Sequence, residues 1–332
     1  MRPAKLPDEI VATILAFSSA VPDLVRCGAV CRQYRRLIAA PGALPVRVLA
    51  LGTCRSVRPA DAVRLCERWC NTIVRLDVTA CQRLSSSAIA TLCAMLTNLR
   101  ELVVAHCPSL TALQAILRPI SERLVSLDCS GSPVRLLLPP GMAFPALCRL
   151  RARLCSGLAV RSISEVNAGL LEVLDLSGAD ILVDLPRFTR LRVLSLATCK
   201  GLDAPAIGRV ISASRATLEE VDLSGSDIAY VDGDGVFASL TAVNLNRCSR
   251  LSSIRIYMPR LRSLHIAWTR QLPVEDVPSL LNDHVEIVDL TGNPSVTADT
   301  LDAVRRSAPR AGILVESCRG VPRDVRIRMR SQ

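Results

Sequence analysis

LRELVVAHC, residues 99 to 107, is one copy of a nine-residue phrase that recurs along the chain. The phrase runs apolar, two variable residues, apolar, one variable, apolar, two variable, and closes on Cys or another small residue. Eleven clear copies and a degenerate twelfth begin at residues 46, 73, 99, 124, 147, 171, 191, 218, 240, 261, 285 and 310. Their average spacing is 24 residues, so the chain is a linear array of similar short units.

Half of the 14 cysteines occupy the ninth place of this phrase. They are Cys54, Cys81, Cys107, Cys155, Cys199, Cys248 and Cys318. A thiol held in register with apolar residues is interpreted as a packing residue, not as half of a disulfide or a catalyst. At that place it can fill a small apolar gap and donate its weak S–H to a loop carbonyl.

The period and the pattern resemble the leucine-rich repeat, in its cysteine-containing class, over about four fifths of the chain. Apolar residues at the fourth and sixth places predict a short strand with one buried face, paired in parallel with the strand of the next repeat. The resemblance implies an α/β solenoid, a horseshoe with a parallel sheet on its concave side and helical or irregular segments on its convex side.

The segments that return from one strand to the next differ in length. Apolar residues at helical spacing are expected in the longer ones. One of these segments begins with Thr297 to Asp299, where Thr or Asp can cap a helix. The residues expected on one helix side are Ala88, Ile89, Leu92, Cys93 and Leu96, and then Leu301, Val304 and Arg305. Shorter returns that contain Pro186 and Pro259 predict turns or extended chain.

The composition excludes several classes of protein. The chain is 50% hydrophobic but only 3% aromatic, as expected for thin repeated slices of Leu, Val, Ile, Ala and Cys. No apolar run reaches the roughly 20 residues of a membrane span. Asp8 and Glu9 stand where a secretory signal would be apolar. Fourteen cysteines without an export signal are therefore expected to be reduced thiols, in the cytosol or the nucleus.

The segment before the repeats follows a different pattern. Residues 6 to 38 read LPDEIVATILAFSSAVPDLVRCGAVCRQYRRLI. This segment resembles the F-box. The matching residues are Leu6-Pro7, then Ile10, Ile14, Leu15 and Phe17 at helical spacing, Asp23-Leu24, Val30-Cys31-Arg32, Tyr34 and Arg35-Arg36-Leu37. It departs from the family where Ser18-Ser19-Ala20 ends the first helix and where Tyr34 replaces the commoner Trp.

An F-box implies docking to the Skp-family adaptor of cullin–RING ubiquitin ligases. The residues expected to touch the adaptor are Leu6, Pro7, Ile10, Ile14, Leu15, Val30 and Tyr34. About 40 residues without a disulfide or metal rarely hold a stable core alone, and an exposed apolar face implies a partner. A second interpretation is a helical cap that only covers the open end of the solenoid.

Three regions follow: an F-box at 4–43, about twelve leucine-rich repeats at 44–318 and a basic tail at 319–332. The predicted protein is a non-enzymatic substrate receptor that recruits the adaptor and cullin and presents an unidentified protein substrate on the repeats. One alternative is a non-ligase scaffold of a cytoskeletal or organelle complex, with the F-box as a cap. Another is an inhibitor-like horseshoe that binds one enzyme.

The side chains at the third, fifth and seventh places of each phrase are expected on the concave, substrate-binding face. Eight acidic side chains stand there against four basic ones, although the whole chain carries +11. Five of the acids are fifth-place aspartates: Asp77, Asp128, Asp175, Asp222 and Asp289. They are interpreted either as a track for a basic peptide or as a repeat idiom, Asp-Leu-Ser-Gly, whose side chains bond neighbouring groups where the strand turns.

Two further groups are candidates for binding on this face. Arg149, Arg151 and Arg153 stand at period two on one strand, where flanking Asp128 and Asp175 or a bound phosphate or carboxylate would balance them. His265 and Trp268 lie in one repeat, and an exposed aromatic is a fair binding anchor.

Other chemistry finds little support in the sequence. The tail carries five arginines against one aspartate, but without interleaved aromatics it is interpreted as a solvated segment and nucleic-acid binding is not favoured. Cys66 and Cys70 share a helix face and lack further ligands at zinc spacing. The three histidines fall in three different repeats. No cofactor, metal or catalytic residue is predicted.

Overall fold

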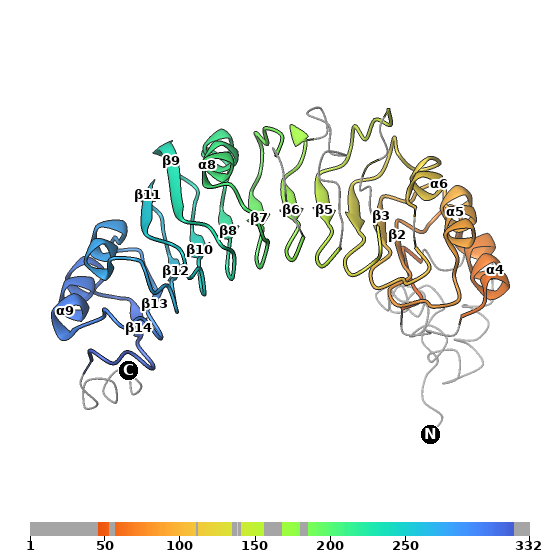
Figure 1. The fold of residues 1–332 in the computed structure, drawn as a ribbon. Helices are drawn as coiled ribbons and strands as arrows, with labels where there is room; N and C mark the ends of the chain where they lie inside the picture. Colours follow the sequence, from red (N-terminus) through yellow and green to blue (C-terminus); the bar gives the residue numbers. More distant parts are fainter. Residues whose placement is uncertain are drawn as a thin grey trace, which may run out of the picture. The chain divides into compact units, whose positions relative to one another are not determined.

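A computed structural model describes residues 46–52, 57–110, 112–134, 138, 141–155, 168–179 and 185–321. The F-box segment with all its expected adaptor contacts, Cys54 and the last eleven residues lie outside the described residues. The chain divides into two compact units, residues 1–147 and 148–332. Each unit is a stack of repeats (Figure 1).

The described residues of the first unit form four parallel strands, one from each of its repeats. They are β1 (Val48–Ala50), β2 (Arg75–Asp77), β3 (Glu101–Val103) and β4 (Ser126–Asp128). Equivalent places pair across the sheet, as in Leu76 beside Leu102, so the register follows the nine-residue phrase.

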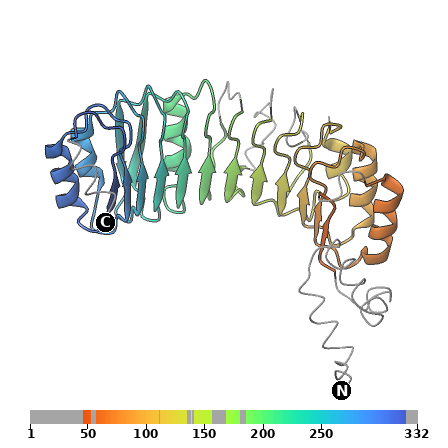
Figure 2. The same cartoon turned by 90° about the horizontal axis from the view of Figure 1, so that it is seen from below.

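The second unit holds eight such strands, in chain order and again parallel. They are β5 (Arg149–Arg151), β6 (Val173–Asp175), β7 (Val193–Ser195), β8 (Glu220–Asp222), β10 (Ala242–Asn244), β12 (Ser263–His265), β13 (Ile287–Asp289) and β14 (Gly312–Leu314). Within the unit they run side by side in one direction (Figure 2).

Each of these twelve strands covers the third to fifth places of its phrase, including the degenerate twelfth copy. The central, fourth-place side chain is buried in every strand, because it points into the interior of its repeat while the side chains on either side point to the opposite face of the sheet. First-, fourth-, sixth- and ninth-place residues form the core of each unit, except for Arg310, which is exposed at the first place of the twelfth copy. The predicted α/β solenoid with parallel strands is therefore confirmed.

Helices lie in the longer returns. In the first unit they are α4 (Pro59–Trp69), α5 (Ser86–Met95) and α6 (Gln114–Leu117); in the second they are α8 (Ala204–Ala213), the 3₁₀ helix η2 (Val274–Leu280) and α9 (Ala298–Ser307). Thr297 caps α9, as predicted, through a capping box with Thr300. Leu301 and Val304 form the buried side of α9, whereas Arg305, predicted on the same helix side, is exposed with Asp302 3.9 Å away.

Two returns of the second unit form a small parallel sheet of their own. It pairs β9 (Tyr230–Val236) with β11 (Ser253–Tyr257). The prediction of extended chain before Pro259 is confirmed by β11, whereas β9 was not predicted. A glycine of α8 lets β9 lie this close to the helix, since an added Cβ on Gly208 would be 2.8 Å from Asp232 O.

Candidate protein-binding face

Several buried ninth-place groups tie their repeat to the one before it. Cys107 Sγ donates to Val78 O at 3.2 Å, Cys199 Sγ to Leu176 O at 3.2 Å and Cys248 Sγ to Leu223 O at 3.1 Å. Each acceptor is the sixth-place carbonyl of the preceding repeat. Ser132 stands in place of Cys, and its Oγ donates to the equivalent carbonyl, that of Val104, at 2.7 Å. Ser226 and Thr269 instead donate to the sixth-place carbonyl of their own repeat. These thiols are core residues, as predicted.

The next feature lies at the eighth place, where the chain leaves the strand edge. All eleven described eighth-place residues have a positive φ, between +52° and +73°. They are Ala80, His106, Gly131, Leu154, Gly178, Thr198, Gly225, Arg247, Trp268, Gly292 and Ser317. The left-handed backbone explains the glycine of the Asp-Leu-Ser-Gly idiom, because a Cβ is unfavourable there.

Large and small eighth-place residues face each other in adjacent repeats. Leu154 lies over Gly178, and Trp268 lies over Gly292 with its ring where a Cβ on that glycine would stand. Leu154 is 65% exposed and Trp268 40% exposed. The sequence analysis identified Trp268 but did not identify Leu154 as an exposed apolar residue. The glycines that occupy the eighth place in four repeats indicate a left-handed backbone there, and this signal could have found Leu154.

Fifth-place aspartates perform a turn function in both units. Asp77, Asp128, Asp175, Asp222 and Asp289 each use Oδ1 to accept a hydrogen bond from the backbone N–H two residues later, at 2.9 to 3.1 Å. The repeat-idiom interpretation of this row therefore describes a real contact. One carboxylate oxygen of each residue is left for other partners.

The second oxygen meets different neighbours in different repeats. Asp77 Oδ2 lies 3.6 Å from Arg75, and Asp175 Oδ2 lies 3.5 Å from Arg153 Nε. Asp289 Oδ2 is 3.8 Å from His265 Nδ1, whose other nitrogen is 2.7 Å from Ser263 Oγ. Arg153 therefore belongs with Asp175, one of the two acidic partners expected for the arginine group. Arg149 and Arg151 end β5 on the same side, and the structure gives each of them an interaction as well.

We call the third-, fifth- and seventh-place side chains of β8, β10, β12, β13 and β14 the acidic face. Its carboxylates are Glu220, Asp222, Asp289 and Glu316, and these fifteen places contain no Lys or Arg. His265 is their one basic residue. On the same face Ile287 is 41% exposed and Leu314 48% exposed. Trp268 lies at the edge of this face, in the turn that follows β12.

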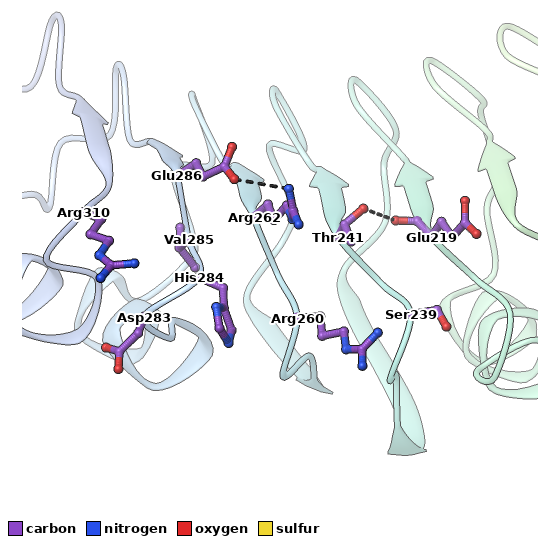
Figure 3. A pocket seen from close by; sticks show the side chains of 10 residues that line it. All are labelled: Glu219, Ser239, Thr241, Arg260, Arg262, Asp283, His284, Val285, Glu286 and Arg310. Atoms are coloured by element: carbon purple, nitrogen blue, oxygen red, sulfur yellow. Dashed lines mark hydrogen bonds and ion pairs between the residues drawn. The ribbon is translucent and has the colours of Figure 1, made fainter.

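A pocket of about 610 Å³ in the second unit lies at the opposite end of these strands, where the chain enters them. Figure 3 shows Arg262 facing Glu286, at 3.4 Å, and the Thr241 hydroxyl donating to the backbone oxygen of Glu219 at 3.2 Å. Glu219 pairs further along with Arg192, at 2.8 Å. Charged side chains of successive repeats therefore pair with one another at this edge. We interpret these pairs as contacts that stabilise the stack of repeats.

Thiol and metal chemistry can be judged from burial. Desolvation raises the pKa of Cys66 to about 12 and that of Cys93 to about 12, so both are protonated at neutral pH. In the described ranges no group of three or more His, Cys, Asp or Glu residues could hold a metal ion. Within those same ranges no helix is long and apolar enough to cross a bilayer.

Comparisons with known proteins cover both parts of the chain. Residues 3–48 match the F-box-like family model. A chain in the crystal structure of the yeast Rad7 and Elc1 complex is similar to this one at 15% identity and a TM-score of 0.54, over 84% of this chain and 72% of the other. The chain therefore combines a segment that matches the F-box-like family with a leucine-rich-repeat fold.

An internalin (InlF) of Listeria monocytogenes resembles this protein at 12% identity and a TM-score of 0.52, over 77% of this chain and 71% of the other. At such identities the likeness concerns the fold alone. A search of curated proteins found no significant match. The F-box assignment thus rests on residues 3–48, and the repeat assignment on the strands described above.

Proposed function

We propose that this protein is the substrate-recognition subunit of an SCF-type cullin–RING ubiquitin ligase. Its F-box would dock the Skp-family adaptor, and its repeats would bind a protein substrate. The mechanism is proximity: other subunits transfer ubiquitin, and this chain performs no chemistry of its own. The site of action would be the cytosol or the nucleus.

The match of residues 3–48 to the F-box-like model, directly before a stack of leucine-rich repeats, is the observation that carries this proposal. The fold similarity to a chain of the Rad7 and Elc1 complex adds support, because that solved structure also contains a second protein. The open strand faces add a surface of exposed apolar and charged side chains on which a protein can bind.

A pull-down of the full chain with a purified Skp-family adaptor tests the proposal. We expect capture of the adaptor, and loss of that capture in a Leu6→Ala/Pro7→Ala variant. Leu314→Ser is the matched control, since it lies far along the sequence on the acidic face and should retain the adaptor. Failure of the unmodified chain to bind any Skp-family adaptor would favour the scaffold alternative.

A further inference from the structure

We propose that the acidic face binds an extended peptide in which basic side chains alternate with apolar ones. This inference rests on the proposed function in one respect: it takes the peptide to be part of the ligase substrate. The binding itself is a property of the repeats and can be measured without the ligase.

Charge is the first argument. The chain as a whole carries +11, yet the fifteen places of the acidic face hold four carboxylates and no Lys or Arg. Asp222 uses Oδ1 in its turn, and Oδ2 has no protein partner among the described residues. Glu220 and Glu316 are exposed. A basic side chain is therefore the complementary group, and a polyanion such as nucleic acid is disfavoured.

Apolar exposure is the second argument. Ile287 pairs in register with Gly312, and Leu314 is two residues further along the same strand. An added Cβ on Gly312 would meet only Glu286 O, at 3.7 Å, so these two exposed side chains flank a position that has no side chain of its own. Trp268, on the edge of the same face, adds a third apolar anchor. Clustered exposed apolar side chains of this size mark binding surfaces.

The third argument concerns the peptide backbone. Asn244 Oδ1 accepts from Asn246 N at 3.2 Å, and Asn246 Oδ1 accepts from Ala267 N at 2.7 Å. These bonds fix both amide groups with Nδ2 as the remaining donor, and in the part of the chain that is described neither Nδ2 has a protein acceptor. These two oriented amide donors lie between the carboxylates of β8 and the apolar side chains of β13 and β14, and they suit the carbonyls of an extended peptide.

Neighbouring strands lie about 4.8 Å apart and an extended peptide advances about 3.3 Å per residue, so about seven residues cross the five strands. The probe is a fluorescent eight-residue peptide of alternating Arg and Leu, titrated against the full chain by anisotropy. A second peptide, with Glu in place of Arg, controls for apolar binding alone. We expect the Arg–Leu peptide to bind at least about tenfold more tightly.

Variants locate the site. Ile287→Ser/Leu314→Ser should weaken binding of the Arg–Leu peptide by about tenfold, as expected for apolar anchors. Glu220→Gln/Glu316→Gln should weaken it about fivefold at low salt and much less at high salt. Val236→Ser, with 50% exposure in β9, and Glu275→Gln, exposed in η2, are the matched controls and should bind normally. Circular dichroism checks that each variant is folded.

Equal binding of the two peptides, or equal loss in the control variants, would overturn the proposal. So would binding that appears only in an Arg326→Gln/Arg328→Gln/Arg330→Gln variant, because the chain's own basic segment would then be the occupant of this face. Adaptor capture is scored separately. An adaptor that binds while neither peptide does would refute this inference and leave the proposed function intact.

Discussion

The strand face of β5 and β6 and the acidic face belong to the same unit, and both contain fifth-place aspartates with the same turn hydrogen bond. They differ in the partner of the second oxygen. Asp175 faces Arg153, whereas Asp222 has no cationic neighbour in the described structure. The comparison teaches that the aspartate is a constant of the repeat, and that the side chains around it determine whether its charge is available to a ligand.

The largest loss of stability is expected at the eighth place, where both regions have a left-handed backbone. Gly178→Ala and Gly292→Ala should each lower the free energy of unfolding by about 3 kcal/mol, since left-handed strain of about 1 kcal/mol adds to overlap with the side chain above. Gly141→Ala is the control, because its φ is +79° but nothing lies within 4 Å of the added Cβ. It should cost about 1 kcal/mol. Urea denaturation measures all three, and equal costs would contradict the packing argument.

The second prediction separates the two regions. Asp175→Ala removes acceptors for Ser177 N and Ser177 Oγ and the neighbour of Arg153, whereas Asp222→Ala removes the acceptor for Ser224 N. We expect a loss of about 2 kcal/mol for the first and about 1 kcal/mol for the second, because Asp175 is buried and leaves more unsatisfied groups. Thermal and urea unfolding check the order. If Asp222→Ala proved the more destabilising, the turn hydrogen bond would not be the function that the two aspartates share.

The third prediction concerns the core and not either face. Burial raises the pKa of Cys66 and of Cys93 from 9.0 to about 12. The folded state therefore holds these protons more tightly, so stability is retained below pH 9 and falls progressively between pH 9 and 12. About 1 kcal/mol per thiol should be lost by pH 10. Cys66→Ala/Cys93→Ala should flatten this dependence in urea unfolding at several pH values; an unchanged slope would contradict it.

The smallest effect is expected for Arg153→Gln, which would make β5 and β6 more like the acidic face. Arg153 is 60% exposed at its side chain, so the loss in stability should be below about 0.5 kcal/mol. Affinity for the Arg–Leu peptide should rise, by about twofold or less, because the second oxygen of Asp175 loses its cationic neighbour. Anisotropy titration at low salt measures this change. A fall in affinity would show that the arginine itself contributes to binding.

Much of the fold was predictable because one nine-residue phrase specifies strand, core and register together. Even the twelfth copy, which begins with Arg310, forms its strand, since Ile313 and Val315 keep the two inner apolar places. The returns were less predictable. β9 contains Asp232 to Gly235, which reads as a loop, and becomes a strand only because α8 and β11 lie beside it.

For the candidate site, the sequence identified the outward places and their charges but not their partners. Period two brings Arg153 and Asp175 to one side of the sheet, but whether they meet depends on side-chain conformation in adjacent repeats. Leu314 was assigned to the outward row without a role. Its exposure beside Ile287 follows from Gly312, whose missing side chain matters only once the strands are paired.

The pairing of large eighth-place residues with glycines has a consequence for how such a chain can lengthen. His106 precedes Gly131, Leu154 precedes Gly178, Thr198 precedes Gly225 and Trp268 precedes Gly292, each pair in adjacent repeats. Arg247 and Trp268 follow one another with no glycine between them, so this pairing holds for four pairs of repeats and not for the whole array. Duplication of both repeats of one such pair would preserve its contact, so a pair is the unit by which these parts of the array can lengthen without a new clash.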